Sequence, residues 1–459
     1  MSGSGQCRSK RSLGADARST SARDLALRAL ALMDEGTPVQ AAVDSVLAAS
    51  PAPARERRLA SELVYGCARE RIRTEAVLGR LMRKPEGLPR PILHILAIAI
   101  HSLLFQSGIP PHAAISEAVK QAERRYGGRL ARVANGVLRS LQRLGEAPLE
   151  QAWYEDARDE PAVRPWRAAC RFWSLPESIA DLWRDAYGEE AALALMRRSF
   201  QRPWTGIRIN ARHPLAAALR DALAAAVPEA ERASLGAWGM AFAPGALPEE
   251  ILDQTLAQLR ESGLLAFQSA GSQAVLAELG LAAWRNPVWD ACAGVGGKSL
   301  ALLEAGVPVR LATDTSLARL SRLVALGESA GAAPLLLALA DAAMPPLRSW
   351  EGHILVDAPC SGLGVLARRP DIRYPGRRSR DVLRAYPQTQ ARILTALAAR
   401  LHHGRELAYL TCTLNPQENE EVVATLLERG NGLELVRSWT TPMDHPWLEG
   451  MFGALLRRR

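Results

Sequence analysis

The sequence has no cysteine pair at the spacing of a metal site or a disulfide framework. Its 459 residues contain six cysteines, none of them in a C-x-x-C pair, and no histidine lies at ligand spacing beside them. Zinc sites need such closely spaced thiolate and imidazole ligands, so we expect no metal. Scattered single thiols persist in a reducing compartment, and we therefore expect a cytoplasmic protein.

The sequence also lacks a long apolar run. The longest, residues 92–105, includes His94 and His101 and is too short to cross a bilayer. Arg8 and Arg11 are not followed by an apolar stretch, so they do not mark a secretory signal. We expect no membrane segment, and we interpret residues 92–105 as a buried helix.

The length and the charge of the chain indicate a multidomain globular protein with a polyanionic partner. A chain of 459 residues, 48% of them hydrophobic, is expected to form two or three globular domains. The formal net charge of +9 and the pI of about 9.6 favour a polyanionic partner such as nucleic acid. Charge alone does not identify that partner.

Helical patterns fill the first third of the chain. Residues 1–18 are rich in Ser, Gly and Arg and are expected to form a disordered tail. Ser21 and Asp24 have the spacing of a helix-capping box. No strand-like alternation follows before residue 145, so residues 19–145 predict an all-helical bundle.

The pattern changes further along the chain. Residues 146–248 begin as an acidic, proline-bearing linker and continue as a small α+β middle region with a strand-like piece at residues 206–210. Residues 249–459 alternate apolar runs with helical stretches, which predicts a Rossmann-like α/β domain with a mostly parallel sheet. Its expected strands are residues 287–290, 308–313, 335–339, 353–357 and 406–411.

A glycine turn follows the first of these strands. Its glycines are Gly294, Gly296 and Gly297. They let the backbone turn tightly and approach a ligand at the start of a helix. A phosphate loop would need glycine at position 292, where this chain has cysteine. An ordinary tight turn is the alternative, but three expected strands end in acids, namely Asp290, Asp314 and Asp341, and Asp314 is placed to bind ribose hydroxyls.

Two cysteines lie at the ends of later strands. Cys360 follows Asp357 and Pro359, and the proline stiffens the strand exit. The carboxyl edge of a parallel sheet faces the ligand crevice, which favours a functional role over the usual buried thiol. Thiols at this edge predict a nucleophile beside an adenosine cofactor.

Cys412 has a further local feature. Asn415 and Pro416 are the residue types of a helix N-cap and first turn. The partial positive charge of a helix N-terminus favours a thiolate at Cys412, whereas Glu418 opposes it. A thiolate suits nucleophilic attack, and a buried structural thiol is the alternative.

Methylation of cytosine carbon 5 uses such a site. Carbon 5 is a poor nucleophile until a thiolate adds to carbon 6, after which it can attack an electrophilic methyl group. An acid near ring nitrogen 3 stabilises the adduct, and loss of the carbon-5 proton with elimination frees the thiol. One nucleophile, one thiol that assists release and one acid complete this cycle. The base must be unstacked, so a loop or a flipped base is expected.

The chain resembles the RNA 5-methylcytosine methyltransferases of the Sun type over nearly its whole length. The stretches that carry the resemblance in the α/β domain are residues 290–298, 357–364, 368–372 and 411–420. The first third resembles the NusB-like RNA-binding domain at residues 60–66, 109–115 and 134–139. This fused domain points to the members that modify ribosomal RNA.

The resemblance implies a class I methyltransferase that uses S-adenosylmethionine to methylate a cytosine of 16S ribosomal RNA. It implies that Cys412 is the nucleophile, that Cys360 assists release and that Asp357 belongs to the catalytic group. The residues it places at the cofactor are Cys292, Ala293, Gly294, Val295, Gly296, Gly297, Lys298, Asp314, Asp341 and Asp357. Val295 departs from the proline that the family usually has.

Some alternatives stay open at this point. The substrate is either ribosomal RNA or transfer RNA, and a non-catalytic RNA-binding assembly factor would keep the same fold. We expect a monomer. An arginine run either contacts the RNA backbone or forms a solvated loop; it consists of Arg368, Arg369, Arg373, Arg377, Arg378 and Arg380.

Overall fold

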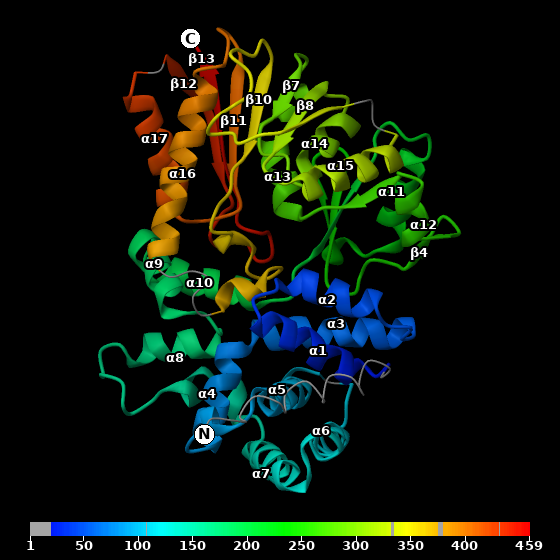
Figure 1. Ribbon diagram of the computed structural model, residues 1–459, viewed down its shortest axis with the longest axis vertical. Coiled ribbons are helices and arrows are strands. Elements are labelled where there is room, and N and C mark those ends of the chain that lie inside the picture. Colours follow the sequence, from blue (N-terminus) through cyan, green and yellow to red (C-terminus); the bar gives the residue numbers. More distant parts are fainter. Residues whose placement is uncertain (1–19, 107, 332–334, 375–379, 431) are drawn as a thin grey trace, which may run out of the picture. The chain divides into compact units, whose positions relative to one another are not determined.

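The computed structural model describes residues 20–106, 108–331, 335–374, 380–430 and 432–459. The chain forms two compact units, which Figure 1 shows in ribbon form. The first unit comprises Met1–Asp181 and Arg369–Tyr374, and the second comprises Leu182–Arg368 and Pro375–Arg459. The expected disordered tail, residues 1–18, lies outside the described residues.

The first unit is helical. Its helices are α1 (Ala22–Asp34), α2 (Val39–Ala48), α3 (Ala54–Arg69), α4 (Arg71–Leu81), α5 (Arg90–Phe105), α6 (Pro111–Tyr126), α7 (Gly128–Leu144) and α8 (Arg164–Phe172), and α9 (Glu177–Tyr187) spans its boundary. Short 3-10 turns are η1 (Pro85–Gly87), η2 (Ala147–Leu149) and η3 (Gln151–Tyr154). The hydroxyl of Ser21 accepts the Asp24 N–H and caps α1. The described residues up to 145 contain no strand, which confirms the all-helical prediction.

The apolar helix predicted at residues 92–105 is confirmed as α5, most of whose apolar side chains are buried. Its His101 pairs with the buried Glu70 of the α3–α4 junction, with Nδ1 2.7 Å from Oε2. Gly66 of α3 permits this approach, because a Cβ there would lie 2.2 Å from the His101 ring. The glycine in the NusB-like stretch 60–66 is thus explained by helix packing.

The acidic stretch that we interpreted as a linker contributes to the first unit. Its Tyr154 is buried, and the hydroxyl donates a hydrogen bond to Pro148 O at 2.9 Å. Arg73 of α4 donates to the same carbonyl at 2.7 Å. Turns η2 and η3 therefore pack onto the helices that precede them.

The second unit is built on a seven-stranded sheet. Its strands are β7 (Val288–Asp290), β8 (Val309–Asp314), β9 (Leu336–Leu339), β10 (His353–Asp357), β11 (Glu406–Thr411), β12 (Leu433–Thr440) and β13 (Phe452–Arg458). The order is β12-β13-β11-β10-β7-β8-β9, and β13 alone runs antiparallel to both neighbours. The five predicted strands are confirmed to within one residue at each end, whereas β12 and β13 were not predicted.

Helices cover both faces of this sheet, as Figure 1 shows. On one side lie α13 (Ala270–Glu278), α14 (Gly297–Glu304) and α15 (Leu317–Ser329), and on the other lie α16 (Arg380–Ala398) and α17 (Glu420–Glu428). Leu300 and Leu323 belong to the core on the first side, and Leu394 and Val423 to the core on the second. This two-sided burial explains why the central strands are apolar throughout.

A smaller four-stranded antiparallel sheet precedes the large one, as expected of an α+β middle region, but its last strand lies beyond residue 248, where we expected that region to end. Its strands are β1 (Thr205–Ile209), β2 (Arg232–Leu235), β3 (Gly239–Phe242) and β6 (Leu265–Phe267), in the order β2-β3-β1-β6. Around it lie α10 (Glu189–Phe200), α11 (Ala216–Ala226), α12 (Leu256–Glu261) and the hairpin of β4 (Glu250–Ile251) and β5 (Gln254–Thr255). Arg208 of β1 forms a buried ion pair with Glu304 of α14, at 2.6 Å, which joins the two sheets' layers.

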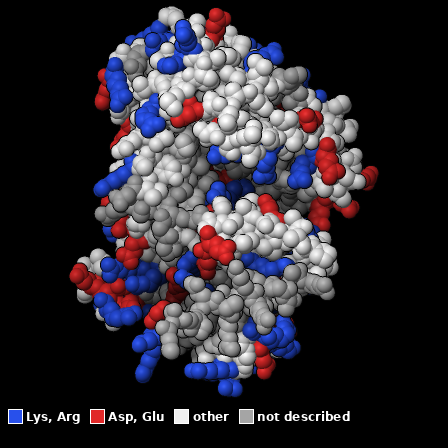
Figure 2. All heavy atoms as spheres, in the orientation of Figure 1, with Lys and Arg blue, Asp and Glu red and all other residues white. Residues whose placement is uncertain are grey.

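Surface charge is mixed. Figure 2 shows Lys and Arg side chains interspersed with Asp and Glu side chains on the face it displays. The net charge of +9 is therefore not gathered into a single basic surface there. Among the described residues, no helix has the length and apolar character needed to cross a bilayer.

Candidate active site

A glycine turn joins β7 to α14. Gly294 and Gly296 have φ angles of 57° and 84°, which glycine adopts without strain. A Cβ at residue 296 would lie 1.9 Å from a methyl carbon of Leu323, so the packing of α15 against the turn requires glycine there. Asp314, at the end of β8, accepts a hydrogen bond from the Gly294 N–H at 2.9 Å. The structure thus brings the turn and Asp314 together.

Asp290 fixes the first residues of the turn. Its side chain is 1% exposed and accepts hydrogen bonds from Ser299 Oγ at 2.5 Å and from the Cys292 N–H at 3.3 Å. Burial raises the pKa of Asp290 to about 7, because the ionised carboxylate loses its hydration. Burial also raises the pKa of the Cys292 thiol, so that thiol is neutral at physiological pH.

The edge formed by β7, β8 and β9 offers the surfaces that an adenosine group needs. Asp341 follows β9, and its carboxylate accepts the Ala343 N–H at 2.8 Å. Apolar side chains beside these acids in the chain are exposed: Val295 by 39%, Leu317 by 67% and Met344 by 76%. Carboxylates for ribose hydroxyls and apolar surface for a purine ring are both present. The residues of this edge therefore fit an adenosine cofactor.

Lys298 connects the cofactor turn to the thiol-bearing strands. Its buried ammonium group lies 2.6 Å from Asp357 Oδ2, at the end of β10. Burial is the largest single influence and would lower the pKa of Lys298, but Asp357, Cys412 and Asp290 together outweigh it, so the pKa is raised. Lys298 is therefore a charged partner of Asp357, a contact that the sequence motifs did not reveal.

The two strand-end cysteines lie side by side. Cys360 follows β10, Cys412 follows β11, and their Sγ atoms are 3.2 Å apart. The Cys412 N–H also donates to Cys360 Sγ, at 3.3 Å. Both residues are partly exposed. The geometry gives two neighbouring thiols within reach of a ligand.

The contact between the thiols separates their acidities. The hydrogen bond from Cys360 lowers the pKa of Cys412, and the same contact raises the pKa of Cys360. Besides this bond, Lys298 also lowers the pKa of Cys412, whereas burial and the carboxylates of Asp357 and Glu418 raise it. These influences make Cys412 the more acidic thiol of the pair, so we assign the contact as Cys360 donating a hydrogen bond to Cys412.

The cap that we predicted at Asn415, with Pro416 at the first position, is present, but it opens a 3-10 turn instead of the α-helix that we expected. Pro416–Glu418 form a short 3-10 turn, η8, and α17 begins at Glu420. The side chain of Asn415 does cap this turn, accepting the Gln417 N–H at 3.2 Å. Because α17 begins only at Glu420, its N-terminus is not the feature that favours a thiolate at Cys412.

Described members of the arginine run after Cys360 have partners inside the protein. Arg368 donates hydrogen bonds to the Glu449 carboxylate and to Trp204 O. Arg373 is buried and donates to Trp173 O and Ser174 O, at 3.1 and 2.7 Å. These bonds favour a structural role for both arginines. Arg369 pairs with Asp371 at 3.2 Å, while Arg377, Arg378 and the Arg380 side chain lie outside the described residues.

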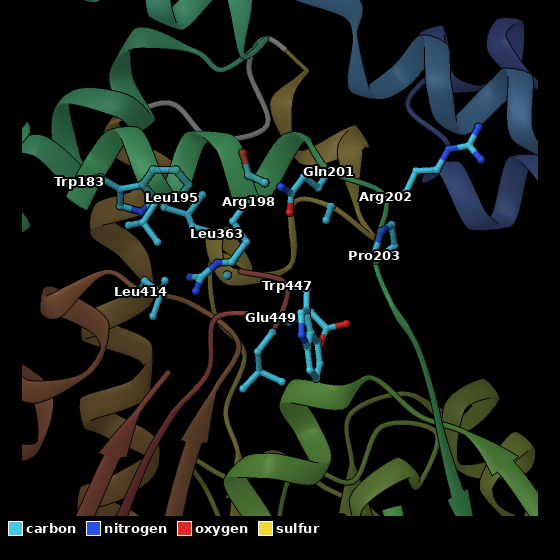
Figure 3. Close-up of a pocket in the computed structure, with 14 residues that line it drawn as sticks. Trp183, Leu195, Arg198, Gln201, Arg202, Pro203, Leu363, Leu414, Trp447 and Glu449 are labelled. Carbon is cyan, nitrogen blue, oxygen red and sulfur yellow. The ribbon is translucent and has the colours of Figure 1, made fainter. Parts of the chain in front are cut away.

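A small pocket adjoins the loops that follow both cysteines. Figure 3 shows the Arg198 side chain extending from α10 toward Leu363 and Leu414. Burial lowers the pKa of Arg198 to about 10, and the guanidinium donates to Pro442 O at 2.9 Å. No sequence motif identified Arg198, because its position beside the loops depends on long-range packing.

Two families match the chain. Residues 282–447 match the family described as 16S rRNA methyltransferase RsmB/F, and residues 20–143 match the NusB family. A Bacillus subtilis (strain 168) protein named "Probable ribosomal RNA small subunit methyltransferase B" is 30% identical over 419 residues, which cover 90% of this chain and 89% of that protein. An Escherichia coli O6:K15:H31 protein named "Ribosomal RNA small subunit methyltransferase B" is 30% identical over 422 residues, covering 87% and 88%.

Solved structures share the fold. A crystal structure described as PH0851 has a TM-score of 0.72 at 19% identity and covers 95% of this chain and 98% of that one. The structure described as NSun6 from Pyrococcus horikoshii with SFG has a TM-score of 0.51 at 18% identity, covering 62% and 98%. At these identities the likeness concerns the fold.

Proposed function

Because this chain belongs to the RsmB/F family of 16S rRNA methyltransferases, we propose that it methylates carbon 5 of a cytosine in small-subunit ribosomal RNA. The chain is an RNA methyltransferase of the RsmB type, and its cofactor is S-adenosylmethionine. The observation that carries the cytosine-5 assignment is the pair of thiols 3.2 Å apart, next to the ion pair of Lys298 and Asp357.

The residues that would hold the cofactor are those of the turn at 292–297, together with Asp314 and Asp341. When bound, S-adenosylmethionine supplies an electrophilic methyl group. The glycines let the backbone approach it, Asp314 and Asp341 bind hydroxyl or amino groups, and the exposed Leu317 and Met344 cover apolar ring surface.

Cys412 begins the reaction as a thiolate. Its sulfur forms a bond to carbon 6 of the flipped cytosine, and the electron pair of the 5,6 double bond shifts through the ring toward nitrogen 3. The pair of Lys298 and Asp357 holds a proton that it can donate toward nitrogen 3 and later take back. Carbon 5 is thereby made nucleophilic.

Release reverses the addition. After methylation, the carbon-5 proton leaves to water, and its electron pair re-forms the 5,6 double bond as the sulfur–carbon bond breaks. Cys412 departs as a thiolate, which the Cys360 thiol stabilises by donating a hydrogen bond across the 3.2 Å between the sulfurs. Cys360 therefore assists release.

The test is methyl transfer from labelled S-adenosylmethionine to small-subunit ribosomal RNA. We expect Cys412→Ala to abolish transfer and Cys360→Ala to accumulate a covalent protein–RNA adduct. Cys170→Ala removes a buried thiol of α8 and serves as the matched control, with activity retained. Undiminished cytosine methylation by Cys412→Ala would refute the nucleophile role.

The substrate is tested separately. Nucleotide-resolution mapping of 5-methylcytosine in RNA from a deletion strain should show one site lost from small-subunit ribosomal RNA. Loss from transfer RNA instead would move the same chemistry to the other substrate. Failure of the purified protein to bind the cofactor in calorimetry would favour the non-catalytic assembly factor. We also propose that the protein is a monomer and that it is located in the cytoplasm.

A further inference from the structure

A buried polar network joins the two loops that carry the cysteines. At its centre is Glu418, which is 0% exposed. Its Oε2 accepts the Ser361 N–H at 2.8 Å, and its Oε1 accepts Asn415 Nδ2 at 3.0 Å. Ser361 directly follows Cys360, and Asn415 belongs to the loop after Cys412. One carboxylate therefore binds both cysteine-bearing loops.

Side chains from α16 and from the loops complete the network. Gln390 Nε2 donates to Glu418 Oε2 at 3.2 Å and to Pro359 O at 3.0 Å. The hydroxyl groups of Ser361 and Thr413 lie 2.8 Å apart across the two loops. All of these polar side chains are buried. Buried polar groups are costly to leave unpaired, so the network strongly disfavours separation of the loops.

A carboxylate suits this position better than other acceptors. Three donors converge on Glu418, from Ser361, Asn415 and Gln390. An ionised carboxylate only accepts hydrogen bonds, whereas an amide at the same place would direct its own N–H groups at some of these donors. The negative charge does not itself favour a thiolate, because Glu418 raises the pKa of both Cys360 and Cys412. The benefit of Glu418 must therefore be geometric.

We propose that Glu418 is a positioning residue that holds the Cys360 thiol against Cys412, so that Cys412 is the sulfur free to attack. Its effect on catalysis rests on the proposed function, but the arrangement of the two thiols is a property of the folded chain. Loss of the network would let the Cys360 loop move away and remove the hydrogen bond that distinguishes the sulfurs.

Limited alkylation tests this role without RNA. The full-length protein is treated near neutral pH with substoichiometric iodoacetamide, and modification at Cys412 and Cys360 is quantified by mass spectrometry. In the wild type we expect Cys412 to react first. Glu418→Ala should lower the Cys412-to-Cys360 ratio by about tenfold, because the hydrogen bond that distinguishes the two sulfurs is lost. Glu418→Gln, which keeps one acceptor oxygen, should fall between the two.

The matched control is Glu421→Gln, which removes the same charge from an exposed position on α17. It should leave the alkylation ratio unchanged. Thermal unfolding of each variant separates loss of fold from loss of positioning, and Glu418→Gln decides the matter if Glu418→Ala does not fold. An alkylation ratio equal to the wild-type ratio in a folded Glu418 variant would overturn the proposal.

Kinetics connect the arrangement to the reaction. Glu418→Gln should lower kcat for methyl transfer while the KM values for RNA and for the cofactor stay close to wild type, because the residue is fully buried and offers no surface to a ligand. A wild-type protein that methylates no cytosine, yet whose alkylation ratio depends on Glu418, would refute the proposed function and leave the positioning role standing.

Discussion

Replacing Asp290 by asparagine is expected to remove a pH dependence of stability. The carboxyl group is 1% exposed, and its pKa is raised to about 7 by burial. In the unfolded chain an aspartate titrates near about 4. Between these values the unfolded state ionises while the folded state keeps its proton, so stability falls as pH rises from about 4 to about 7 and then levels off.

The size of this effect follows from the shift. About three pKa units correspond to about 4 kcal/mol, of which roughly 2.5 kcal/mol falls between about pH 5 and pH 8. Asparagine is nearly isosteric and can keep both contacts, accepting the Cys292 N–H and donating to Ser299 Oγ. Asp290→Asn should therefore gain stability relative to wild type as pH rises from about 5 to about 8, by roughly 2.5 kcal/mol.

Urea unfolding at the two pH values measures this difference. Tryptophan fluorescence is a suitable signal, because Trp289 is buried in the same strand and its indole N–H donates to Thr313 Oγ1 at 3.0 Å. Glu328→Gln removes an exposed carboxylate of α15 and should follow the wild-type pH dependence. Equal pH dependence in Asp290→Asn and wild type would show that Asp290 does not hold its proton in the folded protein.

Three further perturbations test other parts of the structure. Lys298→Met should raise the pH midpoint for alkylation of Cys412, because a nearby positive charge is lost while the Asp357 carboxylate stays. A pH-rate profile that does not move would contradict this. Gly296→Ala should abolish cofactor binding in calorimetry and destabilise the fold by about 1–3 kcal/mol. The added Cβ would lie 1.9 Å from Leu323 of α15, and the φ angle of 84° strains any residue other than glycine. Wild-type affinity for the cofactor would refute this packing argument. Arg373→Met should lower the free energy of unfolding by about 2–4 kcal/mol, because the buried Ser174 carbonyl and the partly buried Trp173 carbonyl lose their donor. Unchanged urea midpoints would contradict this.

The central strands were predictable because they are covered on both faces. Strand β10 buries Ile354, Leu355 and Val356 without polar alternation, which gives a short continuous apolar run. Strand β13 was missed because it ends in charged residues. There, Arg457 pairs with Glu406 of the neighbouring β11 at 2.9 Å. A cross-strand ion pair makes charge compatible with a strand, but the local sequence does not show the partner.

In the candidate site, the residues at strand ends were predictable, but their contacts with distant parts of the chain were not. Thiols and acids at the ends of parallel strands must gather at one edge of the sheet, so strand ends alone bring Asp357, Cys360 and Cys412 near each other. The contact of Lys298 with Asp357 joins residues 59 positions apart and depends on how α14 starts. The α-helix expected after Cys412 starts later, because Asn415 caps the 3-10 turn Pro416–Glu418 that precedes α17.

The helical unit is assembled from two separate stretches of chain, since it takes in the segment Arg369–Tyr374 that follows the Cys360 motif. Within that unit Arg373 donates to backbone carbonyls of Trp173 and Ser174, and the guanidinium of Arg71 lies 4.1 Å from the ring centroid of Tyr374. A fragment that ends at Asp181 would lack Arg373 and Tyr374, and the space that these side chains fill in the helical unit would become a cavity. Moving this helical unit between relatives therefore requires the six-residue segment Arg369–Tyr374 as well.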